Sequence, residues 1–247
     1  MHIPKTAGTS LRSIAERQYR PAEFARLYPG SDSQIEDFLA CSGSPAAVIG
    51  HFRFGLHERL AAGARYVTFL RDPIDQVVSH FNFLAASTAS HHREQLGPDD
   101  RLEDFAAHPW AQNLQTQFVC GWLPDAIAAD PDAAFERTLE VLAAHFVGVG
   151  LVERFEASIH ALAPALGWQV GRIPHLNPSP RGPRAVLRRD LDPSLARRIE
   201  DANACDRRLY EHVRERVARL PGAPHATLRG RASAVAARIL ARFGGTR

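Results

Sequence analysis

The sequence predicts an α/β fold with a mostly parallel central sheet and helices that cross from one strand to the next. Three observations support this class. Short apolar runs of strand type alternate with helical patterns, their lengths are typical of parallel crossovers, and a glycine-containing loop leads directly into the first helical pattern. The 247 residues, 45% of them hydrophobic, are enough for one sizeable core of an ordinary globular protein.

The first element is a loop, HIPKTAGTS, over residues 2–10. Gly8 is expected to allow a tight backbone path, so that N–H groups at the start of the following helix point outward at the positive end of the helix dipole. Lys5 adds a full charge and is the only lysine among 30 lysine and arginine residues. Hydroxyl donors are supplied by Thr6, Thr9 and Ser10. The stretch predicts an anion-binding loop, although its spacing differs from that of nucleoside triphosphatases.

The strand that normally precedes such a loop is expected to be short or truncated. Only Met1, His2 and Ile3 come before Pro4. A clipped chain, a late start codon and an unusually short strand each account for this, and the sequence does not choose among them. Other strands are expected where apolar, aromatic and β-branched residues gather, at 47–51, 65–70 and 146–150.

The strand at 65–70 has the clearest signal and ends at Arg71-Asp72-Pro73. Asp72 is a typical N-cap and Pro73 a typical first helical residue, so a helix is expected to begin here and to run to about Leu84. Arg71 then stands at the carboxyl end of a buried strand, where open α/β sheets bind ligands. Ser79 lies about two turns along the same helix.

Helices are expected over most of the rest of the chain. Their ranges are 11–20, 35–39, 55–62, 102–107, 111–120, 131–142, 153–166 and 193–220. Residues 171–184 are rich in proline and glycine and are expected to form a loop between the last two helices. We expect one domain over residues 1–222 and a basic helical tail over residues 223–247.

Composition narrows the class of function. The formal charge of +3 suits an anionic ligand but is too small for a nucleic-acid-binding surface. Cys41, Cys120 and Cys205 are odd in number and far apart, so they indicate neither a disulfide framework nor a zinc site. No apolar run reaches the ~18 residues of a membrane span. We therefore expect a cytoplasmic protein, with the arginine-rich tail as a candidate weak contact to the anionic surface of the inner membrane.

Five segments of the chain, taken in order, resemble those of sulfotransferases, in the branch that includes heparan sulfate 2-O-sulfotransferase and related bacterial carbohydrate sulfotransferases. They are residues 2–10, Gly50-His51-Phe52, Phe69-Leu70-Arg71-Asp72-Pro73 with Ser79, Phe146-Val147-Gly148-Val149 with Glu153-Arg154-Phe155, and Asn177-Pro178-Ser179-Pro180-Arg181. Each segment is a weak signal alone, whereas the set in this order and spacing is a strong one. The resemblance implies a three-layer α/β/α fold of the P-loop NTPase type.

The resemblance also implies a co-substrate, 3′-phosphoadenosine-5′-phosphosulfate (PAPS), and a saccharide or glycolipid acceptor whose hydroxyl takes the sulfuryl group. The residues implied to hold the 5′-phosphosulfate are Lys5, Thr6, Ala7, Gly8, Thr9 and Ser10. Arg71 and Ser79 are implied to bind the 3′-phosphate, and Ser179 and Arg181 to close over the nucleotide. His51 corresponds to the general base and Lys5 to the group that stabilises the leaving oxygen. No metal ion is implied.

Two other functions stay open from the sequence alone, a P-loop kinase for a small molecule and a non-catalytic nucleotide-binding scaffold. The kinase is disfavoured by the loop spacing and by the lack of a magnesium-binding carboxylate after a strand. Competing candidates for the base are His57, His80 and the pair His91-His92. For Arg71, the simpler alternative is an ion pair with Asp72 or Asp75.

Overall fold

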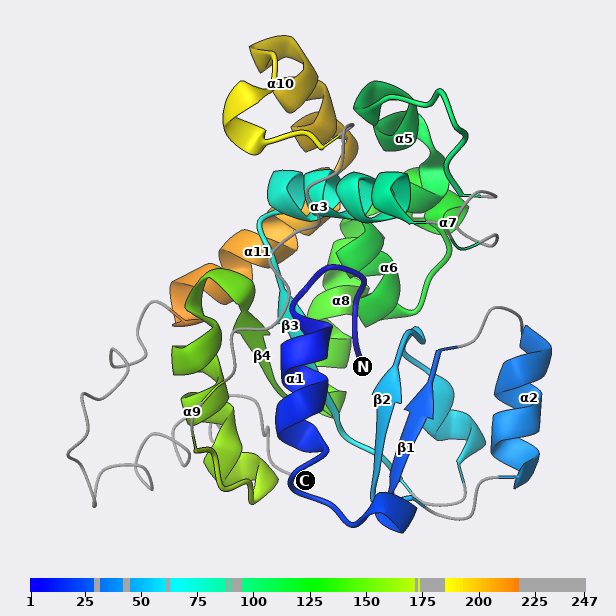
Figure 1. The fold of residues 1–247 in the computed structure, drawn as a ribbon, viewed down its shortest axis with the longest axis vertical. Coiled ribbons are helices and arrows are strands. Elements are labelled where there is room, and N and C mark those ends of the chain that lie inside the picture. Colours follow the sequence, from blue (N-terminus) through cyan, green and yellow to red (C-terminus); the bar gives the residue numbers. More distant parts are fainter. Residues whose placement is uncertain are drawn as a thin grey trace.

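The computed structural model describes residues 1–28, 32–41, 45–60, 63–87, 89, 95–171, 173 and 185–217, and for residues 32, 33 and 41 it describes the backbone alone. This part of the chain forms an α/β fold with many helices and a few short parallel strands (Figure 1). The fold class is confirmed at this level. Ser179, Arg181, the His91-His92 pair and the tail over residues 223–247 lie outside the described residues.

The described strands form two parallel pairs. β1 (Phe24–Leu27) pairs with β2 (Ala47–Gly50), and β3 (Tyr66–Leu70) pairs with β4 (Phe146–Leu151). Residues 1–3 lie between the two pairs, because the His2 amide donates to Gly50 O (2.8 Å) and the Met1 amino group donates to Val67 O (3.1 Å). Residues 1–3 therefore bridge the gap between β2 and β3.

Helices connect and cover these strands. In chain order they are α1 (Gly8–Ala15), α2 (Asp32–Cys41), α3 (Pro73–Ala86), α5 (Leu102–Ala107), α6 (Leu114–Cys120), α7 (Pro124–Ala129), α8 (Pro131–His145), α9 (Phe155–Leu166), α10 (Pro193–Ala202) and α11 (Ala204–Val217). Figure 1 shows α1 and α9 alongside the β3–β4 pair and α3 running across the end of β3.

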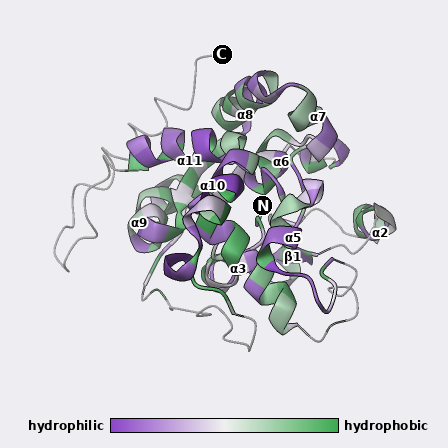
Figure 2. Ribbon diagram, turned by 90° about the horizontal axis from the view of Figure 1, so that it is seen from above, coloured by the Kyte–Doolittle hydropathy of each residue, from purple (hydrophilic) through white to green (hydrophobic). Residues whose placement is uncertain are grey.

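The side chains of β3 point alternately into two hydrophobic clusters. Tyr66 and Leu70 pack with side chains from α6, α8 and α11, whereas Phe69 packs with α1 and α9. This period of two is that of a strand buried on both faces. Figure 2 shows hydrophilic and hydrophobic segments alternating along α11, as expected for a helix with one face on the core. No helix in the described ranges has both the length and the apolarity to cross a membrane.

The start of α3 confirms the boundary predicted from Asp72 and Pro73. The Asp72 carboxylate accepts hydrogen bonds from the amides of Ile74 (3.0 Å) and Asp75 (3.3 Å), and Pro73 is the first helical residue. An N-cap of this type contributes about 1 kcal/mol to stability. Arg71 is therefore fixed between the end of a strand and a capped helix start.

Several elements differ from the expectation. The sequence patterns predict neither β1 nor α7, because β1 has only four residues and α7 is short and largely exposed. The single helix expected over 193–220 is wrong, since α10 ends at Ala202 and α11 begins at Ala204. The Asn203 side chain donates to Ile199 O (2.8 Å) and accepts from the Asn113 amide (2.8 Å). A contact with a residue distant in sequence thus breaks the helix.

Candidate functional site

The predicted anion-binding loop is a strained turn between residues 1–3 and α1. Lys5 (φ 65°) and Ala7 (φ 62°) adopt the left-handed conformation without being glycine, which costs about 1–3 kcal/mol each. The tight backbone path expected of Gly8 is made by these two residues instead, because Gly8 is already the first residue of α1. Strain of this kind persists where surrounding contacts hold the backbone, and it is common at ligand sites.

Gly8 is required for a different reason. The His2 imidazole lies directly against its α-carbon, and a β-carbon at position 8 would stand 1.6 Å from His2 Nε2. The same ring lies against His51, with 4.4 Å between ring centroids, and near Tyr28, at 6.1 Å. The absence of a side chain at Gly8 thus lets the His2 ring fit between the loop and His51.

Thr6 stabilises the loop from within. Its hydroxyl donates to Ile3 O (2.9 Å), its amide donates to the same oxygen (3.3 Å), and the residue is 1% exposed. Both donors of Thr6 therefore make hydrogen bonds within the loop, whereas a ligand contact is expected for the hydroxyl from the sequence. Thr9 and Ser10 lie in the first turn of α1, where a helix offers no carbonyl of its own to the backbone amides.

Lys5 is half-buried and lies close to another cation. Burial lowers the pKa of its ammonium group below the ordinary value, and the positive charge of Arg71 lowers it further. Within the described residues no carboxylate pairs with Lys5, and its Nζ lies 4.3 Å from the centroid of the Phe83 ring on α3. Two like charges held beside a helix start are suited to receive an anion.

Arg71 is held through its backbone by a side chain from α6. Gln115 accepts a hydrogen bond from the Arg71 amide (2.9 Å) and donates one to the Arg71 carbonyl (2.9 Å), much as a neighbouring strand would. Arg71 Nη1 in turn donates to Lys5 O (3.4 Å), and Gln76 on α3 donates to Pro4 O (3.1 Å). The guanidinium is therefore positioned against the loop.

The acids next to Arg71 pair with other arginines. Arg188 Nη1 lies 2.7 Å from Asp72 Oδ1 and 3.0 Å from Asp75 Oδ2, and Arg207 Nη1 lies 3.6 Å from Asp72 Oδ2. In the described part of the chain neither acid pairs with Arg71. Among the described residues the simpler ion-pair alternative for Arg71 is thus not found, and its guanidinium donates to the loop instead.

Ser79 is buried on the face of α3 that meets the loop. Gln76, Ser79 and Phe83 follow one another at helical spacing, i, i+3 and i+7, and so share one face. Gln76 donates to Pro4 O, and Phe83 lies under the Lys5 ammonium. Ser79, between them on this face, is therefore directed toward the same loop.

Asp206 on α11 supports this arrangement from behind. Its carboxylate accepts hydrogen bonds from the amides of Gln115 (3.0 Å) and Thr116 (2.7 Å), in the first turn of α6. It thus caps the helix that carries Gln115. Burial raises the pKa of Asp206 to about 6, against the opposing effect of these hydrogen bonds.

This raised pKa predicts a pH dependence of stability. Because the folded pKa of about 6 lies above the unfolded value of 3.8, the folded protein holds the proton more tightly. The contribution of Asp206 to the free energy of unfolding is therefore fully present below the unfolded pKa. It is lost as the pH rises through the folded pKa. Between about pH 4 and about pH 7, the unfolding free energy of Asp206→Asn should rise by roughly 2 kcal/mol relative to that of the wild type. Urea unfolding at both pH values measures this, and a change of opposite sign would mean that the amide hydrogen bonds dominate.

His51 follows β2 and faces the carbonyl of His2. Its Nδ1 lies 2.6 Å from His2 O, which can only accept, so Nδ1 carries the proton and Nε2 the lone pair. Burial lowers the pKa of His51 below its usual value, the hydrogen bond to His2 partly offsets this, and the charges of the α-amino group and Lys5 lower it again. A neutral imidazole with an available lone pair suits a general base.

The other described candidates for the base lie elsewhere. The Nδ1 atom of His57 is 3.0 Å from the Tyr66 hydroxyl, at the amino end of β3. His80 packs edge-on against Phe105 and Trp110. His51, in contrast, lies at the loop, because its Nδ1 contacts His2 O. Lys5, Arg71 and His51 are thus brought together around one loop.

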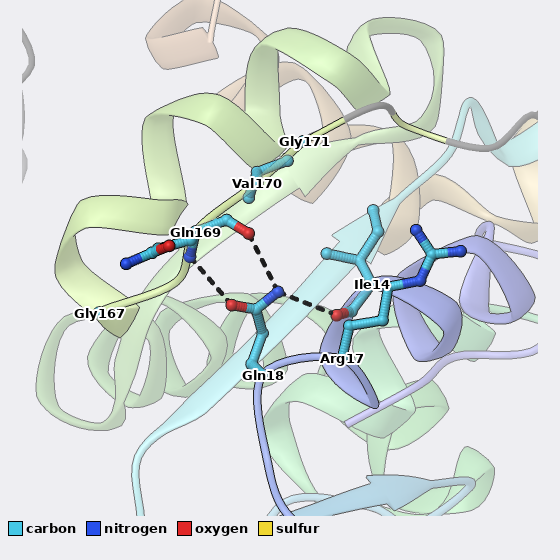
Figure 3. A pocket seen from close by; sticks show the side chains of 7 residues that line it. All are labelled: Ile14, Arg17, Gln18, Gly167, Gln169, Val170 and Gly171. Carbon is cyan, nitrogen blue, oxygen red and sulfur yellow. Dashed lines mark hydrogen bonds between the residues drawn. The ribbon is translucent and has the colours of Figure 1, made fainter.

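A hollow of about 420 Å³ lies away from this loop, at the other end of α1. It is lined by Ile14, Arg17 and Gln18, and by Gly167 with residues 169–171 (Figure 3). The Gln18 side chain donates to Ile14 O (3.3 Å) and Gln169 O (3.2 Å) and accepts from the Gln169 amide (2.9 Å). Because these bonds fasten the segment after α9 to the end of α1, we assign this hollow a structural role.

Several residues that build the site carry no functional signal in the sequence. Gln76, Gln115 and Asp206 are single polar residues within helical patterns, and their partners lie 44 to 91 residues away. A polar residue within an apolar stripe is the one hint, and it does not reveal the partner.

The described residues contain no group of three or more side chains suited to hold a metal ion. A scan against protein-family models and a search of curated proteins give no match to this chain.

Proposed function

We propose that this protein is a sulfotransferase that moves the sulfuryl group of PAPS to a hydroxyl of a carbohydrate or glycolipid, on a three-layer α/β/α fold of the P-loop NTPase type. The observation that carries the proposal is the convergence of Lys5, Arg71 and His51 on the loop before α1, where Arg71 contacts Lys5 O and His51 contacts His2 O. The separate hydrophobic clusters on the two faces of β3 support the three-layer arrangement.

The two cations suit a nucleotide with two anionic groups. Lys5 and the first turn of α1 bind the phosphosulfate, and Arg71 with Ser79 binds the 3′-phosphate, for which a guanidinium fork is well shaped. The charge of Arg71 lowers the pKa of Lys5 in the free protein, so the two groups repel each other. An anion bound at this loop relieves that repulsion, which favours PAPS over a neutral or singly charged ligand.

The remaining group, His51, supplies the proton acceptor. Its Nε2 takes the proton of the acceptor hydroxyl while the hydroxyl oxygen forms a bond to sulfur, and the bond between sulfur and the phosphate oxygen breaks. Lys5 stabilises the negative charge that develops on that phosphate oxygen. The products are a sulfate ester and adenosine 3′,5′-bisphosphate (PAP). A positioned base contributes about 10²–10⁴ in rate.

One assay separates this function from a kinase and from a non-catalytic scaffold. The unfolding temperature is measured with PAP in the absence of magnesium, with ATP plus magnesium, and without ligand. We expect PAP at about 100 times its Kd to add ~2.7 kcal/mol to the stability. A response to ATP and magnesium alone would favour the kinase, and no response to either nucleotide would favour the scaffold. Transfer of radiolabelled sulfur from PAPS to a panel of saccharides then identifies the acceptor.

Removing the Arg71 side chain should mainly weaken nucleotide binding. Loss of a charge-assisted hydrogen bond of about 1.5–3 kcal/mol raises the Kd of Arg71→Ala for PAP roughly 10- to 150-fold, which calorimetric titration measures. Arg65 is the matched control, because it is exposed and immediately precedes β3, at the opposite end of the same strand. Arg65→Ala should bind PAP like the wild type. Equal affinities for the two variants would remove Arg71 from the nucleotide site.

A further inference from the structure

The contact between Lys5 and Phe83 has no role in the chemistry described so far. The Nζ atom of Lys5 lies 4.3 Å from the centroid of the Phe83 ring. Phe83 is 37% exposed, unlike Val77, Phe81 and Leu84 of the same helix, which are buried. Hydrophobic burial therefore does not by itself account for a large aromatic ring at this position of α3.

The geometry is that of a cation–π interaction. An ammonium within about 6 Å of a ring centroid is attracted by the negative face of the ring. At a partly exposed site this attraction favours the charged form of the amine and so raises the pKa of Lys5. It opposes the effects of burial and of the Arg71 charge, both of which lower the pKa of Lys5. The ring thus helps to keep the Lys5 amine protonated beside another cation.

The fold fixes both partners of this contact. Gln76, which precedes Phe83 by two helical turns on the same face, donates to Pro4 O and holds the loop backbone against α3. Arg71 donates a second hydrogen bond to the loop backbone, at Lys5 O. Lys5 itself is held in the left-handed conformation. The start of its side chain is therefore fixed, and the ring lies where the ammonium ends.

We propose that Phe83 is a positioning residue that holds the Lys5 ammonium beside the loop until a bound anion competes for it. The ring contact is a property of the free protein. Only the identity of the competing anion, the phosphosulfate of PAPS, rests on the proposed function. Phe83 therefore acts on the reaction through Lys5, by keeping the charged amine close to the oxygen that it stabilises.

The sequence allows a direct test, because Lys5 is the only lysine. Reductive methylation with ¹³C-formaldehyde labels the Lys5 amine and the α-amino group, and Lys5→Arg, which lacks the Lys5 signal, assigns the two. The titration midpoint of Lys5 is then read by NMR in the free protein. Phe83→Leu should lower the midpoint by roughly half a unit, whereas Phe83→Tyr, which keeps an aromatic face, should leave it unchanged.

A merely structural role of Phe83 would leave the midpoint of Phe83→Leu at the wild-type value, and that result would overturn the proposal. Phe83→Met provides a second aliphatic substitution if leucine disturbs α3. A further titration with PAP separates this inference from the proposed function. If PAP fails to raise the midpoint in the wild type while Phe83→Leu still lowers it, the sulfotransferase proposal loses its support and the role of Phe83 stands. With PAPS, Phe83→Leu should also lower kcat more than it raises KM.

Discussion

Replacing His51 with alanine is expected to lower turnover at least ~100-fold and to leave PAP binding nearly unchanged. The reason is chemical, because an alcohol is a poor nucleophile until its proton has an acceptor. The hydrogen bond from Nδ1 to His2 O leaves Nε2 as that acceptor. Single-turnover kinetics with PAPS and the identified acceptor measure the chemical step, and calorimetric titration with PAP measures the binding.

The pH profile adds a second observation on the same variant. Burial lowers the pKa of His51 below its ordinary value, so the base stays neutral to a lower pH than a free imidazole does. Activity should be lost as the pH falls through this lowered pKa, with the acid limb of kcat/KM below about pH 6.5 in the wild type. The limb should be absent from the residual activity of His51→Ala.

His57 provides the matched control for this prediction. It is also half-buried, but it contacts the Tyr66 hydroxyl at the amino end of β3 instead of the loop. His57→Ala should therefore keep wild-type turnover and the wild-type acid limb. If His51→Ala kept full activity, the base would have to be reassigned, and His57 is then the next histidine to test.

Features of the fold that depend on neighbouring residues could be predicted from the sequence. The boundary at Asp72 and Pro73 is set by a carboxylate and a ring within two residues of the helix start, and the structure confirms it. The strand ending at Leu70 is likewise set by its own aromatic and β-branched residues. Because Arg71 comes directly after this strand, its place at the sheet edge follows from local patterns alone.

The contacts that hold the site could not be predicted, because each joins segments that are distant in sequence. Gln115 reaches the Arg71 backbone from α6, and Asp206 caps α6 from α11. The backbone conformation of the loop could not be predicted either. Local preference assigns the tight turn to the glycine, but the structure places Lys5 and Ala7 in the left-handed conformation. Tertiary hydrogen bonds at Pro4 and Lys5 hold the backbone against that preference.

Gly8→Ala is expected to lower turnover by about 100-fold, although alanine is the better helix former. Without other contacts, alanine at this first position of α1 would stabilise the helix by up to ~1 kcal/mol. The new β-carbon, however, would stand 1.6 Å from His2 Nε2. The His2 ring cannot move away freely, because the rings of His51 and Tyr28 pack against it, with centroids at 4.4 Å and 6.1 Å. A displacement of the catalytic imidazole by ~1 Å is enough for a loss of this size.

The His2→Ala background tests whether the ring is the cause. There the β-carbon at position 8 meets no imidazole, so Gly8→Ala should raise the unfolding temperature, whereas in the wild-type background it should lower it. The double variant should also recover at least ~10-fold of the lost turnover, because the His2 carbonyl that orients His51 belongs to the backbone and is kept. Gly63→Ala is the control, since a β-carbon there meets no atom within 4 Å, and it should be silent in both backgrounds. If the double variant is as impaired as Gly8→Ala alone, glycine is required at position 8 because of its backbone. The contact between His2 and the loop would then have no part in positioning the base.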